Sequence, residues 1–95
     1  MSNKQDYIDK LEAQVNVWRM QISQLEDRAE RAKADVKHEY LLKVNELGDR
    51  VDDFERKIGE MKQIGEESFS ELQRGAEKAW NNISSSFSNA LEKIK

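Results

Sequence analysis

The residues best suited to chemistry in this sequence are one histidine and its acidic neighbours, because the chain has no cysteine. Imidazole and carboxylate groups at close spacing bind divalent metals, and Asp35 and Glu39 flank His38. The spacing of a metal-binding His-Glu-x-x-His helix is missing, and the chain has no second imidazole to complete a site. A solvent-exposed histidine is the better interpretation, so we predict no metal site and no cofactor.

Carboxylates are numerous, but their spacing favours a structural role over acid–base catalysis. Six of them stand four residues before a lysine or arginine, where opposite charges meet on one helix face and add roughly 0.2–0.5 kcal/mol each. No nucleophile–base arrangement and no glycine-rich phosphate loop accompanies them, so we predict that the protein is not an enzyme and binds no small-molecule substrate. The pairs are Asp6/Lys10, Asp27/Arg31, Glu39/Lys43, Glu46/Arg50, Asp52/Arg56 and Asp53/Lys57.

The composition limits the folds that could position these residues. The 95-residue chain is 37% hydrophobic and 37% charged, with no proline, whereas an ordinary soluble domain is roughly 45–50% apolar and about 25% charged. A proline-free chain rich in Glu, Lys, Leu and Ala is typical of long helices, which excludes disulfide scaffolds, β-sandwiches and α/β folds. The low apolar content predicts an all-α coiled coil or antiparallel helical bundle rather than a self-sufficient globule.

The charge balance and hydropathy indicate which partners to expect. A net charge of −3 with both signs mixed along the chain is unlike the basic face of a nucleic-acid-binding protein. No run of eighteen apolar residues could span a bilayer, and the first residues lack the apolar core of a secretory signal. We therefore expect a cytoplasmic protein, with peripheral association with a membrane surface as the alternative.

A seven-residue apolar repeat predicts a heptad coiled-coil helix over residues 1–64. Its apolar positions alternate in steps of three and four, as in the core of a coiled coil. Ser2 and Gln5 form a candidate capping box at its start. After Val36 the steps become four, four and three, which inserts one residue near Tyr40 and predicts local unwinding. The core positions expected to form an oligomer interface are Ile8, Leu11, Val15, Trp18, Ile22, Leu25, Val36, Leu47, Val51, Phe54, Ile58 and Met61.

The heptad pattern fails near Gly65, and a second amphipathic helix is predicted over residues 65–95. Glycine lowers helix propensity, so we place a hinge near Gly65, with Ser68 and Glu71 as a capping box beyond it. Gly48 is the competing break point, since a turn there would fold the chain into a hairpin. An eleven-residue repeat gives the second helix an almost straight apolar stripe. The candidate partner or lipid face on this helix consists of Phe69, Leu72, Trp80, Ile83, Phe87 and Leu91.

Large and small side chains along the repeat favour antiparallel packing. In an antiparallel arrangement about the midpoint, Trp18 faces residues 76–79, where alanines leave room for its ring. In a parallel in-register dimer, Arg28 would lie beside Lys33 of the other chain, and like charges there repel. Antiparallel packing is therefore expected, either between chains or inside a hairpin bent at Gly48.

Three segments carry a family resemblance that covers nearly the whole chain. They are YIDKLEAQ at residues 7–14 followed by Trp18, RAKADVKHEY at residues 31–40, and GAEKAW at residues 75–80. In these segments the chain resembles a family of short bacterial coiled-coil proteins of unassigned function, some of them described as stress-related. The resemblance implies a non-enzymatic structural protein with a continuous helix through its middle, and it supplies no catalytic residue. Family members lack a turn at the position of Gly48 and carry a glycine near position 65. The Gly48 of this chain departs from that pattern, which leaves the hairpin alternative open.

Two functions from different classes fit these patterns. The first is a self-assembling structural or scaffold protein, an obligate homo-oligomer whose only chemistry is helix–helix burial. The second is a peripheral lipid-binding protein, in which the bulky rings of residues 66–95 insert into a lipid surface opposite a Ser- and Asn-rich face. That segment carries four bases against five acids, so anionic lipid would not attract it. Self-assembly is therefore the preferred hypothesis.

Overall fold

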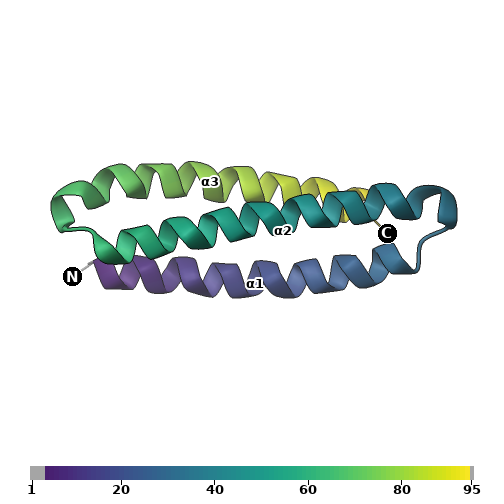
Figure 1. Ribbon diagram of the computed structural model, residues 1–95, viewed down its shortest axis with the longest axis horizontal. Helices are drawn as coiled ribbons and strands as arrows, with labels where there is room; N and C mark the ends of the chain where they lie inside the picture. The colour runs from purple at the N-terminus through teal and green to yellow at the C-terminus, as the bar shows by residue number, and fades with distance from the viewer. Residues whose placement is uncertain (1–3, 95) are drawn as a thin grey trace.

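The structure is a computed structural model that describes residues 4–94, which form three helices and no strand. Helices α1 (Lys4–Glu30), α2 (Ala34–Gln63) and α3 (Glu66–Lys93) run alternately in opposite directions along an elongated bundle of 51 × 19 × 18 Å (Figure 1). The predicted all-α class is confirmed. The capping box expected between Ser2 and Gln5 lies partly outside the described residues, which begin at Lys4.

The chain turns at residues 31–33, where the heptad pattern predicts unbroken helix. Lys33 adopts an extended backbone, and its carbonyl accepts the amide of Val36 to begin α2. The sequence does not mark this turn, because it has no glycine or proline and Ala32 keeps the heptad spacing through it. The two heptad blocks thus belong to different helices, so the one-residue shift near Tyr40 needs no local unwinding.

The second turn lies at Ile64 and Gly65, at the position expected for a hinge. Gly65 is the extended N-cap residue of α3, and its carbonyl accepts the amide of Ser68 at 3.3 Å. Ser68 therefore lies inside the first turn of α3, and its expected capping box with Glu71 does not form. The ammonium of Lys4 donates to the carbonyl of Ile64, which satisfies a backbone acceptor at the end of α2.

Gly48 lies inside α2, and the helix continues through it. A Cβ added at this position would meet no atom within 4 Å, so no close contact requires glycine there. The hairpin bent at Gly48 is therefore wrong. The chain reverses direction at the two short turns instead, which makes neighbouring helices antiparallel within one chain.

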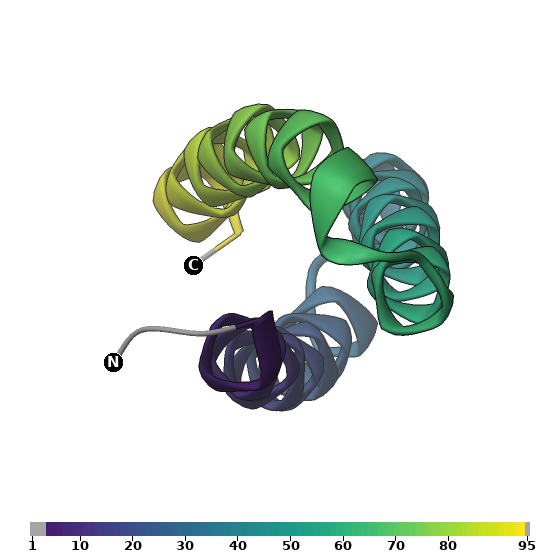
Figure 2. The same cartoon turned by 90° about the vertical axis from the view of Figure 1, so that its left-hand side faces the viewer.

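One hydrophobic core runs along the inside of the bundle. Helix α2 packs against both other helices, whereas α1 and α3 contact each other less extensively and lie to either side of α2 in the end-on view (Figure 2). Burial of a large apolar side chain contributes roughly 1.5–3 kcal/mol, and regular spacing places many such residues of each helix inside. The chain therefore encloses its own core despite its low apolar content. The buried residues are Ile8, Leu11, Val15, Trp18, Leu25, Ala29, Val44, Leu47, Val51, Phe54, Ile58, Met61, Ala76, Ile83, Phe87, Ala90 and Ile94.

Candidate functional site

The residues expected to form an oligomer interface make up much of the interior of this single chain. Ile8, Leu11, Val15, Trp18, Leu25, Leu47, Val51, Phe54, Ile58 and Met61 are buried in one cluster. Ile22 and Val36 are half-buried. The stripe on α1 therefore meets the stripe on α2 within the chain, and these buried residues are not exposed to a second copy.

Four aromatic rings form the centre of the core and tie the three helices together. The Trp18 ring of α1 lies edge-on to Phe54 of α2, with centroids 5.2 Å apart. On α3 it stacks with Phe87 at 5.9 Å and meets Trp80 at 5.7 Å. Such pairs contribute about 0.5–1.5 kcal/mol each beyond their buried area. Packing, rather than ligand binding, accounts for this cluster.

The candidate partner or lipid face of α3 is divided by the fold. Ile83 and Phe87 are buried, while Phe69, Leu72 and Trp80 are half-buried against the core. Only Leu91 is largely accessible, with 40% of its surface exposed. The predicted partner or lipid face therefore includes both core residues and residues on the side of the bundle between α1 and α3.

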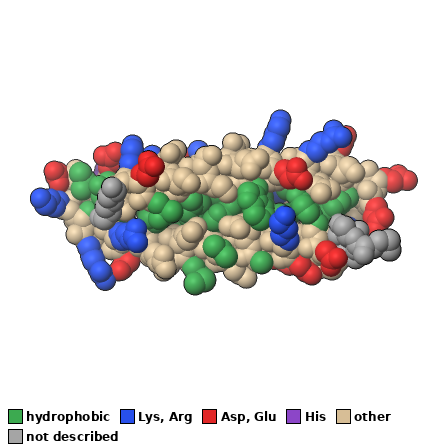
Figure 3. All heavy atoms as spheres, turned by 180° about the vertical axis from the view of Figure 1, so that it is seen from behind, with side chains coloured by type: hydrophobic (Ala, Val, Ile, Leu, Met, Phe, Trp, Pro, Cys, Tyr) green, Lys and Arg blue, Asp and Glu red, His purple; other side chains and the backbone are tan. Residues whose placement is uncertain are grey.

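The side between α1 and α3 holds an open hollow of about 260 Å³ that Tyr7, Lys10, Glu77 and Trp80 help to line. The Lys10 ammonium lies 5.6 Å from the Trp80 ring centroid, within range of a cation–π attraction. Seen from behind, hydrophobic side chains form a band between the two helices (Figure 3). The Tyr7 ring meets Phe69 edge-on at 5.8 Å, which helps close this band toward the start of α1.

The environment of Tyr7, on the side of the bundle between α1 and α3, changes the pKa of its phenol. Burial raises the pKa of Tyr7 above its ordinary value, and the negative charge of Glu77 acts in the same direction. Because the fold favours the neutral phenol, the contribution of this group to stability is complete below the pKa of the unfolded chain and is lost as pH rises through the folded pKa.

We expect an ultraviolet titration of a Tyr40→Phe variant, which keeps only Tyr7, to give a phenolate midpoint above that of the urea-unfolded chain. Adding Glu77→Gln should move the folded midpoint back toward the unfolded one, since a negative neighbour is removed. Equal midpoints in the folded and unfolded chains would contradict the packing of Tyr7 against α3.

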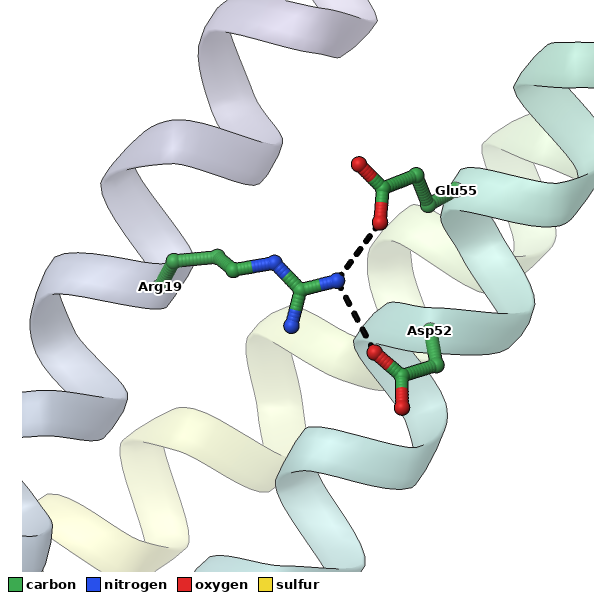
Figure 4. Close-up of polar contacts among 3 residues, drawn as sticks. All are labelled: Arg19, Asp52 and Glu55. Carbon is green, nitrogen blue, oxygen red and sulfur yellow. Dashed lines mark hydrogen bonds and ion pairs between the residues drawn. The ribbon is translucent and has the colours of Figure 1, made fainter.

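Ion pairs fasten α1 to α2 on the outside of the core. The Arg19 guanidinium donates to Asp52 at 2.8 Å and to Glu55 at 2.6 Å (Figure 4). Hydrogen bonds to Asp52 and then to Glu55 raise the pKa of Arg19, so it stays charged throughout the physiological range. Lys62 reaches Glu12 at 2.6 Å in the same way. Exposed pairs of this kind contribute about 0–1 kcal/mol each to the stability of the fold. Their main effect is therefore to fix the alignment of α1 on α2.

The carboxylates form ion pairs within single helices as well as between them. Asp27–Arg31 and Glu46–Arg50 form the expected pairs four residues apart, at 2.9 and 3.0 Å. His38 is exposed, and among residues 4–94 no three His, Cys, Asp or Glu side chains are placed to hold a metal ion. These groups lie on solvated helix faces, where carboxylates pair with lysines and arginines, and Asp9 accepts a hydrogen bond from Gln5 at 2.8 Å.

Val17 and Met20 of α1 are exposed apolar residues, at 47% and 65%, that the heptad and eleven-residue patterns do not predict. They belong to a surface that we call the uncharged face, comprising the outer residues of α1 from Ala13 to Gln24 and residues 79–91 of α3. Arg19 is the one charged residue within these two segments, and it points toward α2. Figure 3 shows only hydrophobic and uncharged side chains over the middle of α1, the lower helix in that view. The signal that could have revealed this face is the absence of charge itself.

Comparisons with known proteins give no match among protein-family models, curated proteins or solved structures. Within the part of the chain that the structure describes, no helix has both the length and the apolar character needed to cross a bilayer.

Proposed function

We propose that this chain is a non-enzymatic, self-assembling structural or scaffold protein whose subunit is the three-helix bundle. The uncharged face is the observation that carries the proposal. Burying a charge costs several kcal/mol unless a partner compensates for the lost water, whereas small uncharged polar and apolar groups are far cheaper to bury. A protein with 37% charged residues that keeps one face free of exposed charge has a surface suited to burial against protein.

The outer surface of α2 supplies the contrast within the same molecule. Its exposed positions include the charged residues Glu46, Asp49, Asp53, Arg56 and Glu60, and Leu42 is an exposed apolar residue near its start. A surface of this composition favours water and repels another copy of itself. Assembly through the side formed by α1 and α3 leaves α2 in solvent, and in this proposal the heptad residues build the subunit while the uncharged face joins subunits.

The mass of the protein in solution tests the proposal. We expect the light-scattering mass to rise with protein concentration from that of one chain, and the association to survive high salt because uncharged contacts are not screened. A mass of 11.1 kDa at every concentration would contradict self-assembly.

Lipid-surface binding is the second candidate, favoured by the half-buried Phe69, Leu72 and Trp80 along the less extensive contact between α1 and α3. If α3 swings away from α1, these three apolar side chains and Leu91 would insert at packing defects of a lipid surface. Small curved vesicles should then blue-shift the Trp80 emission in a Trp18→Phe background. Leu91→Glu should abolish that shift, because a charge would enter the apolar stripe.

Family membership and location belong to the same proposal. The resemblance to short bacterial coiled-coil proteins supports a structural role, because it implies no catalytic residue. We also propose a cytoplasmic location, with association with a membrane surface as the alternative. Both statements are consistent with a subunit built only from packed helices.

A further inference from the structure

Helix α1 carries a second stripe at heptad spacing, on the side away from the core, and the stripe ends at Arg31, the first residue of the turn that follows. Its members follow one another in steps of four and three, as the buried stripe does, and every one is exposed. A sustained heptad on an exposed helix face is the pattern of a helix–helix contact. We call this set the outer stripe; it consists of Asp6, Lys10, Ala13, Val17, Met20, Gln24, Asp27 and Arg31.

The outer stripe is apolar at its centre and charged at both ends. Ala13, Val17 and Met20 occupy the middle, where the unpartnered side chains of Val17 and Met20 are largely exposed. The positions that flank this centre are uncharged: Gln14 and Gln21, which are half-buried, and Asn16 and Ser23, which are exposed. A second helix lying along the centre would therefore bury apolar surface without burying a charge.

The order of charges in the outer stripe is complementary to itself when reversed. If two copies of α1 cross antiparallel about the midpoint between residues 18 and 19, Asp6 lies opposite Arg31 of the second copy and Lys10 lies opposite Asp27. In the same register, Val17 lies opposite Met20 of the second copy. In a parallel in-register pair, each of these charges would face its own copy and repel it.

We propose that a second copy of this chain docks on the outer stripe, antiparallel, with a two-fold axis between Val17 and Met20. The inference rests on the proposed function and gives it a partner, an orientation and a register. A two-fold axis presents the same patch from both subunits, which is the symmetry that a self-complementary stripe requires. The stripe has two acids, two bases and only two large apolar side chains, so it is poorly suited to a lipid surface.

The ends of the stripe keep their local contacts in this dimer. Arg31 pairs with Asp27 four residues earlier at 2.9 Å, and both side chains are exposed enough to accept a further partner. Lys10 lies beside the Trp80 ring and can turn its ammonium outward along the helix surface. Each end of the interface would then contain a small network of opposite charges rather than one isolated pair.

A charge-swap cycle tests the register. Lys10→Glu and Asp27→Lys should each weaken dimerisation roughly tenfold, because one substitution changes two symmetry-related contacts. The double variant should recover most of the wild-type affinity. Residues 10 and 27 lie about 25 Å apart along one helix, so rescue requires contact between two copies and cannot arise from a structural effect within one chain.

A second pair of variants tests the apolar centre. Met20→Glu should abolish the dimer and leave the helical fold intact, because Met20 is exposed. Leu42→Glu is the matched control, since Leu42 is 55% exposed on α2 and lies outside the outer stripe. It should leave the dimer unchanged. Dissociation constants come from sedimentation equilibrium, and circular dichroism melts at low concentration report folding.

The outcomes separate this inference from the proposed function. A wild-type dimer with no rescue in the double variant, or with Met20→Glu as tight as Leu42→Glu, would overturn the α1 register and leave self-assembly standing. A wild-type chain that stays monomeric at every concentration would overturn both. Rescue together with selective loss in Met20→Glu would establish the antiparallel α1 contact.

Discussion

Replacing Trp18 by alanine should lower the free energy of unfolding by about 3–5 kcal/mol. The Trp18 side chain is only 2% exposed and contacts rings from both other helices, so its loss leaves a cavity where the three helices meet. A small domain has a total stability of about 5–15 kcal/mol, and the variant should therefore be close to unfolding at room temperature. Urea denaturation followed by circular dichroism at low protein concentration measures the change.

Two comparisons make the Trp18 result specific. Leu42→Ala removes a large apolar side chain from an exposed site and should change the stability by less than about 0.5 kcal/mol. Trp18→Phe retains an aromatic ring and should lose less than Trp18→Ala. If Trp18→Ala were no more destabilising than Leu42→Ala, the ring could not lie at the centre of the bundle.

A covalent link between α1 and α2 should raise the free energy of unfolding by roughly 4 kcal/mol. Glu12 and Lys62 are joined at 2.6 Å although they lie 50 positions apart, and the chain has no cysteine of its own. Cysteines at both positions, bridged by a short bis-maleimide, would close that loop and reduce the entropy of the unfolded chain. The linked product should migrate as one chain on a denaturing gel, and its urea midpoint should rise.

The same cross-link distinguishes packing within a chain from packing between chains. If the heptad stripes of α1 and α2 paired between two copies, as a continuous helix over residues 1–64 would require, the bridged product would have twice the mass even in dilute solution. Ala13→Cys with Lys62→Cys is the control, because Ala13 neighbours Glu12 but belongs to the outer stripe. That control should give little link within one chain.

The regular spacing of apolar residues predicts the helical segments and their buried faces without any tertiary information. Residues such as Leu11 and Phe54 recur every three or four positions, and that period places them on one side of a helix whatever covers them. The break near Gly65 was equally local, because glycine supplies no core side chain and weakens the helix. The turn at residues 31–33 had no such signal, since its backbone conformation is open to ordinary residues and alanine continues the repeat.

The sequence by itself determined the helical class, the amphipathic faces and the absence of exposed charge over part of the surface, because each depends on composition or on short-range period. Only the tertiary structure decided that the stripes meet within one chain. A short turn costs little loop entropy, whereas bringing a second chain to the same stripe costs several kcal/mol of translational and rotational freedom. The tertiary structure likewise decided that Asp52 pairs with Arg19 across helices rather than with Arg56 on its own helix. Antiparallel docking of α1 on α2 brings Arg19 within reach of Asp52, and intrahelical spacing cannot anticipate that contact.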